Sequence, residues 1–242
     1  MRKRLSCQSG LLLCLILLGA SKLFSQGVVP SGQIQGTVVS QENRGVAKAT
    51  VTVQQQSNPA AGQFRANTIT GTDGSFTFTG VPAGTFTICV QVPGSVYLNP
   101  CTWASSVPSV TLTVGQRASA GIIRLDEGRL LKVRLNDASR VLQADEGKVP
   151  GAKVMIGVWT LEGLFVPMRV RTQGATGRDL EIPVPVGRLL QLSVSSKHFD
   201  LRDEDNAAID ATQGVSLPVQ ASATAASRIY TFNVTGRRPQ QQ

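Results

Sequence analysis

Histidine is almost absent from this chain, and so are the patterns that usually mark an active site. The only histidine in 242 residues is His198, too little for a zinc centre that needs several histidine or cysteine ligands. No H-E-x-x-H helix, G-x-S-x-G turn or phosphate-binding glycine loop occurs. The sequence therefore predicts a protein that is not an enzyme and that uses no metal or other cofactor.

Aromatic residues are also scarce, at 5% of the chain, and most of them fall at positions that face a predicted core.

The formal net charge is +9, but four of the basic residues, Arg2, Lys3, Arg4 and Lys22, lie within residues 1–25. Without that segment the charge falls to +5, and the remaining bases are scattered among acids. A nucleic-acid surface would need clustered bases, so none is predicted.

A long hydrophobic run is missing too, because the apolar segment Leu11–Leu18 is well short of the roughly 18–20 residues that a membrane span needs. A basic start precedes this segment, and small residues follow it at Gly19 to Ser21. This order is typical of a secretory signal, so residues 1–25 are predicted to be a signal peptide, cleaved after Ser21 or Ser25. An uncleaved N-terminal anchor is the alternative. The mature chain is predicted to have no transmembrane span and to lie in the periplasm or outside the cell.

Two of the four cysteines would survive cleavage, Cys89 and Cys101. Exported proteins meet an oxidising environment, so a disulfide between these two residues is expected. Two unpaired, buried thiols are the alternative.

Alternation of apolar and polar residues predicts half-buried strands from residue 33 onward, for example at Phe86, Ile88 and Val90. Turn residues separate the strands, among them Asp73 with Gly74 and Pro82 with Gly84. A single short helical turn is predicted at 203–208. Several carboxylates lie in and around this segment, but they lack the glycine at the turning position of a calcium-binding loop, so no calcium site is predicted.

The chain matches itself at an offset of 103 residues. The identities fall on strand and turn positions: Val46/Val149, Ala49/Ala152, Val51/Val154, Gly71/Gly174, Gly74/Gly177, Val81/Val184, Pro82/Pro185 and Gly84/Gly187. Two copies of one β-sandwich are predicted, at residues 31–125 and 128–235, with a disordered tail at 236–242. Because the connection is short, limited relative motion is expected. Apolar residues after Gly177 are shifted by one position relative to those after Gly74, which predicts a bulge or a changed turn.

The first copy resembles the carboxypeptidase regulatory-like domain. The resemblance rests on four segments: the strands at 33–38 and 45–53, Thr72-Asp73-Gly74-Ser75-Phe76-Thr77-Phe78, and Val81-Pro82-Ala83-Gly84-Thr85-Phe86. It implies a transthyretin-like or prealbumin-like sandwich, a carbohydrate-binding-like fold similar to immunoglobulin domains. The second copy keeps Val184-Pro185-Val186-Gly187 but lacks the Asp-Gly turn.

The resemblance implies accessory behaviour and names no ligand. The predicted function is an exported, non-catalytic structural or interaction module whose partners are cell-envelope proteins or glycans. One alternative is a carbohydrate-binding module that uses Tyr97 and Trp103, which lie in and just beyond the Cys89–Cys101 loop. The other is an accessory domain of a separately encoded enzyme or transporter. If no glycan binds, Tyr97 and Trp103 cap the end of the sandwich.

Overall fold

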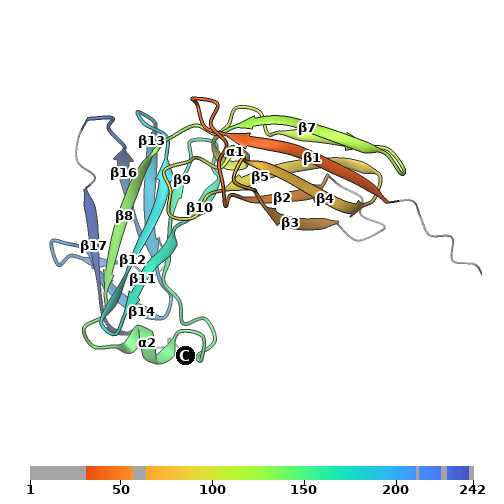
Figure 1. Ribbon diagram of the computed structural model, residues 1–242. Helices are drawn as coiled ribbons and strands as arrows, with labels where there is room; N and C mark the ends of the chain where they lie inside the picture. The colour runs from red at the N-terminus through yellow and green to blue at the C-terminus, as the bar shows by residue number, and fades with distance from the viewer. Residues whose placement is uncertain (1–30, 57–63, 211–212, 225–227, 240–242) are drawn as a thin grey trace, which may run out of the picture.

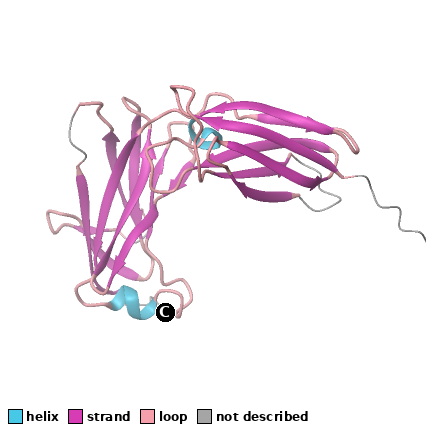
Figure 2. Ribbon diagram, in the orientation of Figure 1, coloured by secondary structure: helices cyan, strands magenta, loops and turns pink. Residues whose placement is uncertain are grey.

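The computed structural model describes residues 31–56, 64–210, 213–224 and 228–239, which are built almost entirely of β-strands (Figure 1, Figure 2). Within these ranges the helices are two short ones, α1 (Pro100–Trp103) and α2 (Val141–Asp145), and neither is long enough to cross a membrane. The predicted all-β sandwich class is confirmed. The predicted signal peptide lies outside the described residues and stays a prediction.

The first seven strands form two sheets around one core. One sheet has the order β4-β1-β7, in which β1 pairs antiparallel with β4 and parallel with β7. The other has the order β3-β2-β5-β6 and is antiparallel throughout. The strands are β1 (Gly32–Val39), β2 (Thr50–Gln55), β3 (Arg65–Ile69), β4 (Ser75–Val81), β5 (Gly84–Gln91), β6 (Ser109–Leu112) and β7 (Arg117–Arg124).

Alternating burial explains why these segments are strands. In β5 the side chains of Phe86, Ile88 and Val90 are buried, and the residues between them are less so. In β4 Phe76 and Phe78 are buried in the same way. Full burial of an apolar side chain of this size contributes about 1.5–3 kcal/mol. The period of two in the sequence therefore marks the inward face of each strand.

The turn at Asp73 and Gly74 carries the chain from one sheet to the other. Asp73 Oδ1 accepts a hydrogen bond from the Ser75 backbone nitrogen at 3.0 Å. Gly74 has a φ of +80°, and a Cβ there would lie 2.1 Å from the Val38 carbonyl oxygen, so only glycine fits. The strands on either side of this turn do not form a hairpin, because β4 pairs with β1 while β3 pairs with β2.

A second sandwich follows, with a core of its own. It consists of a four-stranded sheet, β10-β9-β13-β16, and a six-stranded sheet, β11-β12-β8-β17-β14-β15. Helix α2 follows β8 and lies at the end remote from the first sandwich (Figure 1). The strands are β8 (Arg129–Asn136), β9 (Met155–Trp159), β10 (Phe165–Pro167), β11 (Arg169–Gly174), β12 (Gly177–Val184), β13 (Leu189–Ser195), β14 (Phe199–Arg202), β15 (Ala208–Ile209), β16 (Val215–Gln220) and β17 (Ile229–Arg237).

The strand order of the second sandwich repeats that of the first, with additions. The order β12-β8-β17, in which β8 and β17 are parallel, corresponds to β4-β1-β7, and β10-β9-β13-β16 corresponds to β3-β2-β5-β6. Strands β11, β14 and β15 have no counterpart among the first seven strands. This recurrence gives a structural reason for the repeat at 103 residues. The boundaries 31–125 and 128–235 stay predictions.

The two Val-Pro-x-Gly steps occupy equivalent places. The step with Pro82 and Gly84 joins β4 to β5, and the step with Pro185 and Gly187 joins β12 to β13. Each connection passes from one sheet to the other. A proline suits such a position because it lacks the N–H that a strand ladder would require.

The extra strand β11 explains the shift after Gly177. In the second sandwich β11 and β12 form a hairpin with its turn at residues 175–176, and Gly177 already belongs to the ladder. In the first sandwich β4 starts only after Gly74. Leu180 and Ile182 are still buried, so the changed turn lets the apolar side chains of β12 point into the core despite the shift.

Residues 203–208 do not form the predicted helical turn. The Asp203 backbone nitrogen donates to the Ala207 carbonyl oxygen at 3.0 Å and closes a loop between β14 and β15. Asp203 Oδ1 accepts from the backbone nitrogens of Asp205 at 3.0 Å and Ala207 at 2.8 Å. The prediction is wrong because this carboxylate satisfies the backbone donors of a loop, which is a common alternative to a helix for aspartate.

The last strand continues into the predicted tail. Strand β17 extends to Arg237, whose backbone pairs with Phe199 of β14. Arg238 then donates hydrogen bonds to the carbonyl oxygens of Phe199 at 3.0 Å and Ile209 at 2.7 Å. The disordered tail predicted for 236–242 is therefore wrong at its start, because strand pairing and side-chain hydrogen bonds hold these residues. Residues 240–242 lie outside the described ranges.

The two sandwiches meet at an angle, and the chain is bent like an elbow (Figure 1). The loop after β5 and helix α1 lie at the bend (Figure 1), where they line a common cavity with residues of β10, β11 and β12 of the second sandwich. The disulfide loop singled out in the sequence is therefore part of the junction.

Candidate functional site at the junction of the two sandwiches

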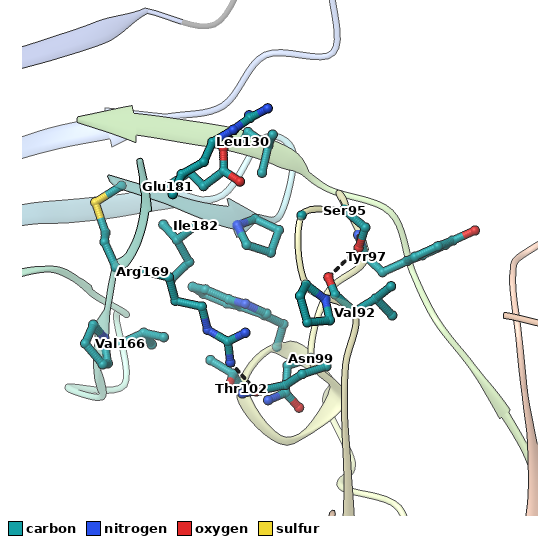
Figure 3. A pocket seen from close by; sticks show the side chains of 18 of the residues that line it. Val92, Ser95, Tyr97, Asn99, Thr102, Leu130, Val166, Arg169, Glu181 and Ile182 are labelled. Carbon is teal, nitrogen blue, oxygen red and sulfur yellow. Dashed lines mark hydrogen bonds and ion pairs between the residues drawn. The ribbon is translucent and has the colours of Figure 1, made fainter. Parts of the chain in front are cut away.

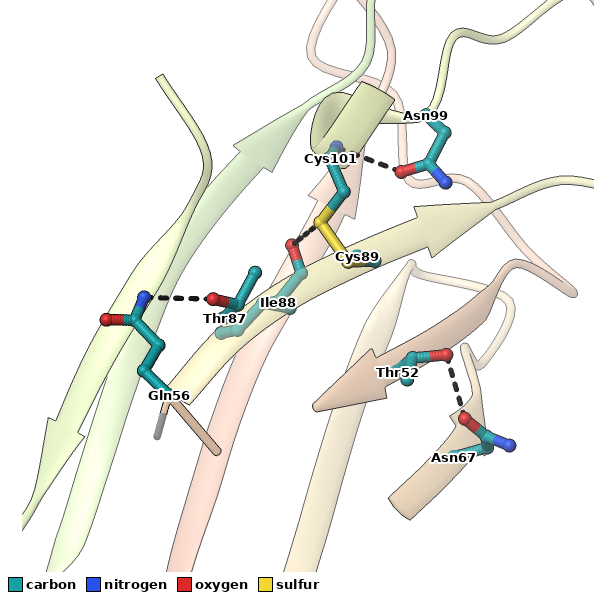
Figure 4. Close-up of a disulfide and its surroundings, with 8 residues drawn as sticks. All are labelled: Thr52, Gln56, Asn67, Thr87, Ile88, Cys89, Asn99 and Cys101. Atoms are coloured by element: carbon teal, nitrogen blue, oxygen red, sulfur yellow. Dashed lines mark hydrogen bonds between the residues drawn. A yellow bond between two sulfur atoms is a disulfide. The ribbon is translucent and has the colours of Figure 1, made fainter. Parts of the chain in front are cut away.

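A disulfide joins Cys89 of β5 to Cys101 of α1 (Figure 4). The predicted pairing is confirmed. Asn99 caps the helix, since its Oδ1 accepts a hydrogen bond from the Cys101 backbone nitrogen at 3.0 Å, and Pro100 occupies the first helical position. The disulfide thus fixes a capped single turn of helix against β5.

This loop packs on the second sandwich. Leu98 and Trp103 are both buried, and both belong to the core formed by strands β8–β17. Backbone hydrogen bonds hold the loop to the connecting segment, from Leu98 N to Asp126 O at 2.8 Å and from Gly128 N to Val96 O at 2.8 Å. The two sandwiches share apolar packing at the bend. Because such packing opposes relative motion of domains, a fixed relative orientation is expected.

A cavity of about 620 Å³ lies between the loop and the second sandwich. The first sandwich contributes residues from Gln91 to Trp103, and the second contributes residues from the ends of β8, β10, β11 and β12. Figure 3 shows Val92, Asn99 and Thr102 on one side and Arg169, Glu181 and Ile182 on the other. Much of the wall is apolar, including Val166, Met168 and Pro183.

The charged groups of the cavity belong to the second sandwich. Arg171 pairs with Glu181, with Nη1 and Oε2 2.9 Å apart, and the Glu181 side chain is only 11% exposed. Arg169 donates a hydrogen bond to the Gln91 side-chain oxygen, across the junction. One arginine is therefore neutralised by a carboxylate, and the other has a neutral partner.

The structure places both predicted ligand residues at this cavity, in different environments. Trp103 lines it but is only 9% exposed, so its ring is not an open stacking platform. Tyr97 also packs against the first core, and Figure 3 shows its ring extending away from the centre of the cavity. Glycan binding by these two residues stays a prediction.

Residues 33–125 match the carboxypeptidase regulatory-like domain family. This part of the chain is a carboxypeptidase regulatory-like domain. The resemblance seen in the sequence is thereby confirmed for the first sandwich. The second sandwich lies outside the match.

Several solved structures are similar at low identity. The Bacillus anthracis TIE protein is 12% identical over 85% of this chain, with a TM-score of 0.34, and this chain spans only 34% of its length. A streptococcal ancillary pilin is 12% identical over 85% of this chain and 63% of its own, with a TM-score of 0.39. The shaft pilin SpaA from Lactobacillus rhamnosus GG is 9% identical over 86% of this chain and 100% of its own, with a TM-score of 0.32. No curated protein matches.

A polar cluster lies outside the regulatory-like domain, at the remote end of the second sandwich. Asp145 of α2 accepts hydrogen bonds from Arg237 at 2.5 and 2.8 Å, and its Oδ2 lies 3.0 Å from His198 Nε2. Hydrogen bonding to Arg237, followed by that to His198, holds the pKa of the Asp145 carboxyl well below its usual range. The hydrogen bonds between Asp145 and Arg237 link α2 to the last strand, β17, so the cluster has a structural role.

The sequence did not reveal the charged residues of the junction cavity or the partners in the polar cluster at Asp145. Arg169 and Glu181 line the cavity because the fold brings β11 and β12 close to the disulfide loop. Asp145 and Arg237 are 92 residues apart, and no local pattern links them. The single histidine, His198, packs edge-on against Phe199, with ring centroids 4.7 Å apart.

Proposed function

We propose that this chain is an exported, non-catalytic structural protein of the periplasm or the extracellular space that holds interaction surfaces at a fixed angle. The observation that carries the proposal is the packing of Leu98 and Trp103 from the first sandwich into the core of the second. Apolar burial across a junction opposes free hinge motion, so the two sandwiches form an angled spacer.

Two further features support this function. The first sandwich matches the carboxypeptidase regulatory-like domain family, and this resemblance implies an accessory role. The disulfide between Cys89 and Cys101 suits an oxidising compartment. Export itself rests on the basic and apolar start of the sequence.

Small-angle X-ray scattering of the mature chain tests the fixed angle. A single bent shape in solution that fits the angle in Figure 1 is expected. A scattering profile that needs a broad ensemble of angles would contradict the proposal. Reduction of the disulfide provides a matched comparison within the same chain.

Compartment and partners need separate measurements. Protein recovered from the periplasm or the medium is expected to have an N-terminal sequence that begins after Ser21 or Ser25. Recovery of the intact N-terminus in the cytoplasm would contradict export.

Proximity labelling in the native envelope is expected to mark a reproducible set of envelope proteins. A hydrolytic activity of the pure chain that a single substitution abolishes would overturn the non-catalytic role.

A further inference from the structure

We propose that the cavity between the two sandwiches binds an amphipathic organic anion, a molecule with an apolar body and one carboxylate, sulfonate or phosphate group. This inference goes beyond the structural role and does not depend on it. It rests on the size of the cavity, the chemistry of its walls and the arrangement of its two arginines.

The size fits a small organic molecule. Ligand pockets in proteins typically measure about 300–1,000 Å³ and lie preferentially where two domains meet. The cavity measures about 620 Å³ and has one wall from each sandwich. Its position is fixed by the same disulfide loop that buries Leu98 and Trp103, so the site is formed before any ligand arrives.

The walls favour an apolar body. The apolar residues that line the cavity include Val92 and Pro93 of the first sandwich and Val166, Met168 and Ile182 of the second. Contact with such side chains removes apolar ligand surface from water, which is favourable in proportion to the area. A neutral sugar, whose hydroxyls need polar partners on every side, suits these walls less well.

The charges favour one anionic group. The charged residues of the cavity are Arg169, Arg171 and Glu181, which leaves a net charge of +1. Glu181 pairs with Arg171 at 2.9 Å. The hydrogen-bond partner of Arg169 is the neutral side chain of Gln91, and no ion pair with a carboxylate is found for Arg169 in the described residues. An anion that reaches Arg169 exchanges a neutral acceptor for a charged one, which makes a stronger hydrogen bond.

Two fluorescent probes of the same shape test this chemistry on the full mature chain. 1-Anilinonaphthalene-8-sulfonate carries a sulfonate, and N-phenyl-1-naphthylamine is its neutral parent. We expect saturable binding of the sulfonate with one site per chain, and weaker binding of the neutral dye. In Arg169→Gln the affinity for the sulfonate is expected to fall on the order of tenfold, with the neutral dye unchanged.

Two more variants separate the site from the surface. Val170→Trp is designed to fill the cavity from the exposed edge strand β11, where an aromatic residue is well tolerated, and is expected to weaken binding of both dyes. Arg65→Gln removes an exposed arginine of β3, far from the cavity, and is expected to change neither affinity. Thermal melting of each variant shows whether it is folded.

The outcomes are distinct. A preference for the sulfonate that Arg169→Gln abolishes and Arg65→Gln preserves supports the inference. Binding of both dyes that Val170→Trp blocks but Arg169→Gln leaves unchanged overturns the anion preference. An absence of saturable binding, or binding that no cavity variant alters, overturns the site.

Discussion

The backbone of Gly128 lies directly against the carbonyl group of Val184 at the bend between the sandwiches. A Cβ on Gly128 would be 2.3 Å from that carbonyl oxygen and 2.6 Å from Leu98 Cδ2. Gly128 immediately precedes β8, the first strand of the second sandwich, and Val184 is the last residue of β12. The close approach lets the loop that carries Leu98 seat against the second core.

Gly128→Ala is expected to strain the junction, because the nearest obstacle is a backbone carbonyl that cannot rotate away. Overpacking of this kind costs about 1–3 kcal/mol. We expect a lower melting temperature together with a changed angle in small-angle scattering. Gly174→Ala is the matched control, since a Cβ there meets only an ordinary contact at 3.6 Å. Equal effects of the two substitutions would contradict the interpretation of the junction.

Trp103→Ala is expected to destabilise the second sandwich although Trp103 belongs to the first. Truncation of a buried tryptophan costs about 3–5 kcal/mol, through lost burial and the void that remains. Trp103 is 9% exposed and packs with residues of β8–β17. Hydrogen exchange followed by mass spectrometry should show faster exchange in the adjoining strands of the second sandwich. A loss of protection confined to residues 32–124 would argue against shared packing.

Reduction of the disulfide should loosen the junction before it unfolds the first core. The bond closes a loop with a sequence separation of 12 residues, and such a loop contributes about 3 kcal/mol in the chain-entropy model. Intact mass should rise by about 2 Da on reduction, because each bond takes up two hydrogens. Chemical denaturation with and without reductant measures the loss. Identical midpoints in the two series would show that the bond carries little of the stability.

Asp145→Asn should lower the melting temperature at neutral pH and matter less in acid. The folded pKa of Asp145 is depressed by Arg237 and His198, so its ionised form stabilises the fold above the unfolded pKa near 4. That contribution is lost as the pH falls from about 4 towards the lower folded pKa. We expect the gap between native and variant melting temperatures to shrink over this range.

Asp200→Asn provides the control for this experiment. Asp200 lies 3.5 Å from Arg238, and its side chain is 46% exposed. Exposed pairs contribute little, so this variant should melt close to the native protein at every pH. A gap for Asp145→Asn that stays constant down to about pH 2 would rule out the ionised carboxylate as its source.

The sequence by itself determined the features that depend on neighbouring residues. Alternation at Phe86, Ile88 and Val90 located a strand, because every second side chain of a strand faces the same side. The Asp73-Gly74 turn and the Val-Pro-x-Gly steps were visible because few residue types suit their backbone geometry. Cys89 and Cys101 were predicted to pair because two cysteines remained in an exported chain, and the structure joins them.

Only the tertiary structure decided what depends on contacts between distant segments. The Asp73-Gly74 turn crosses between sheets because β4 pairs with β1, and a turn motif does not encode that choice of partner. The cavity exists because β11 lies against the disulfide loop, where Arg169 meets Gln91 over 78 residues of sequence. Trp103 is buried for the same reason, because its packing partners belong to the other sandwich and local periodicity carries no information about them.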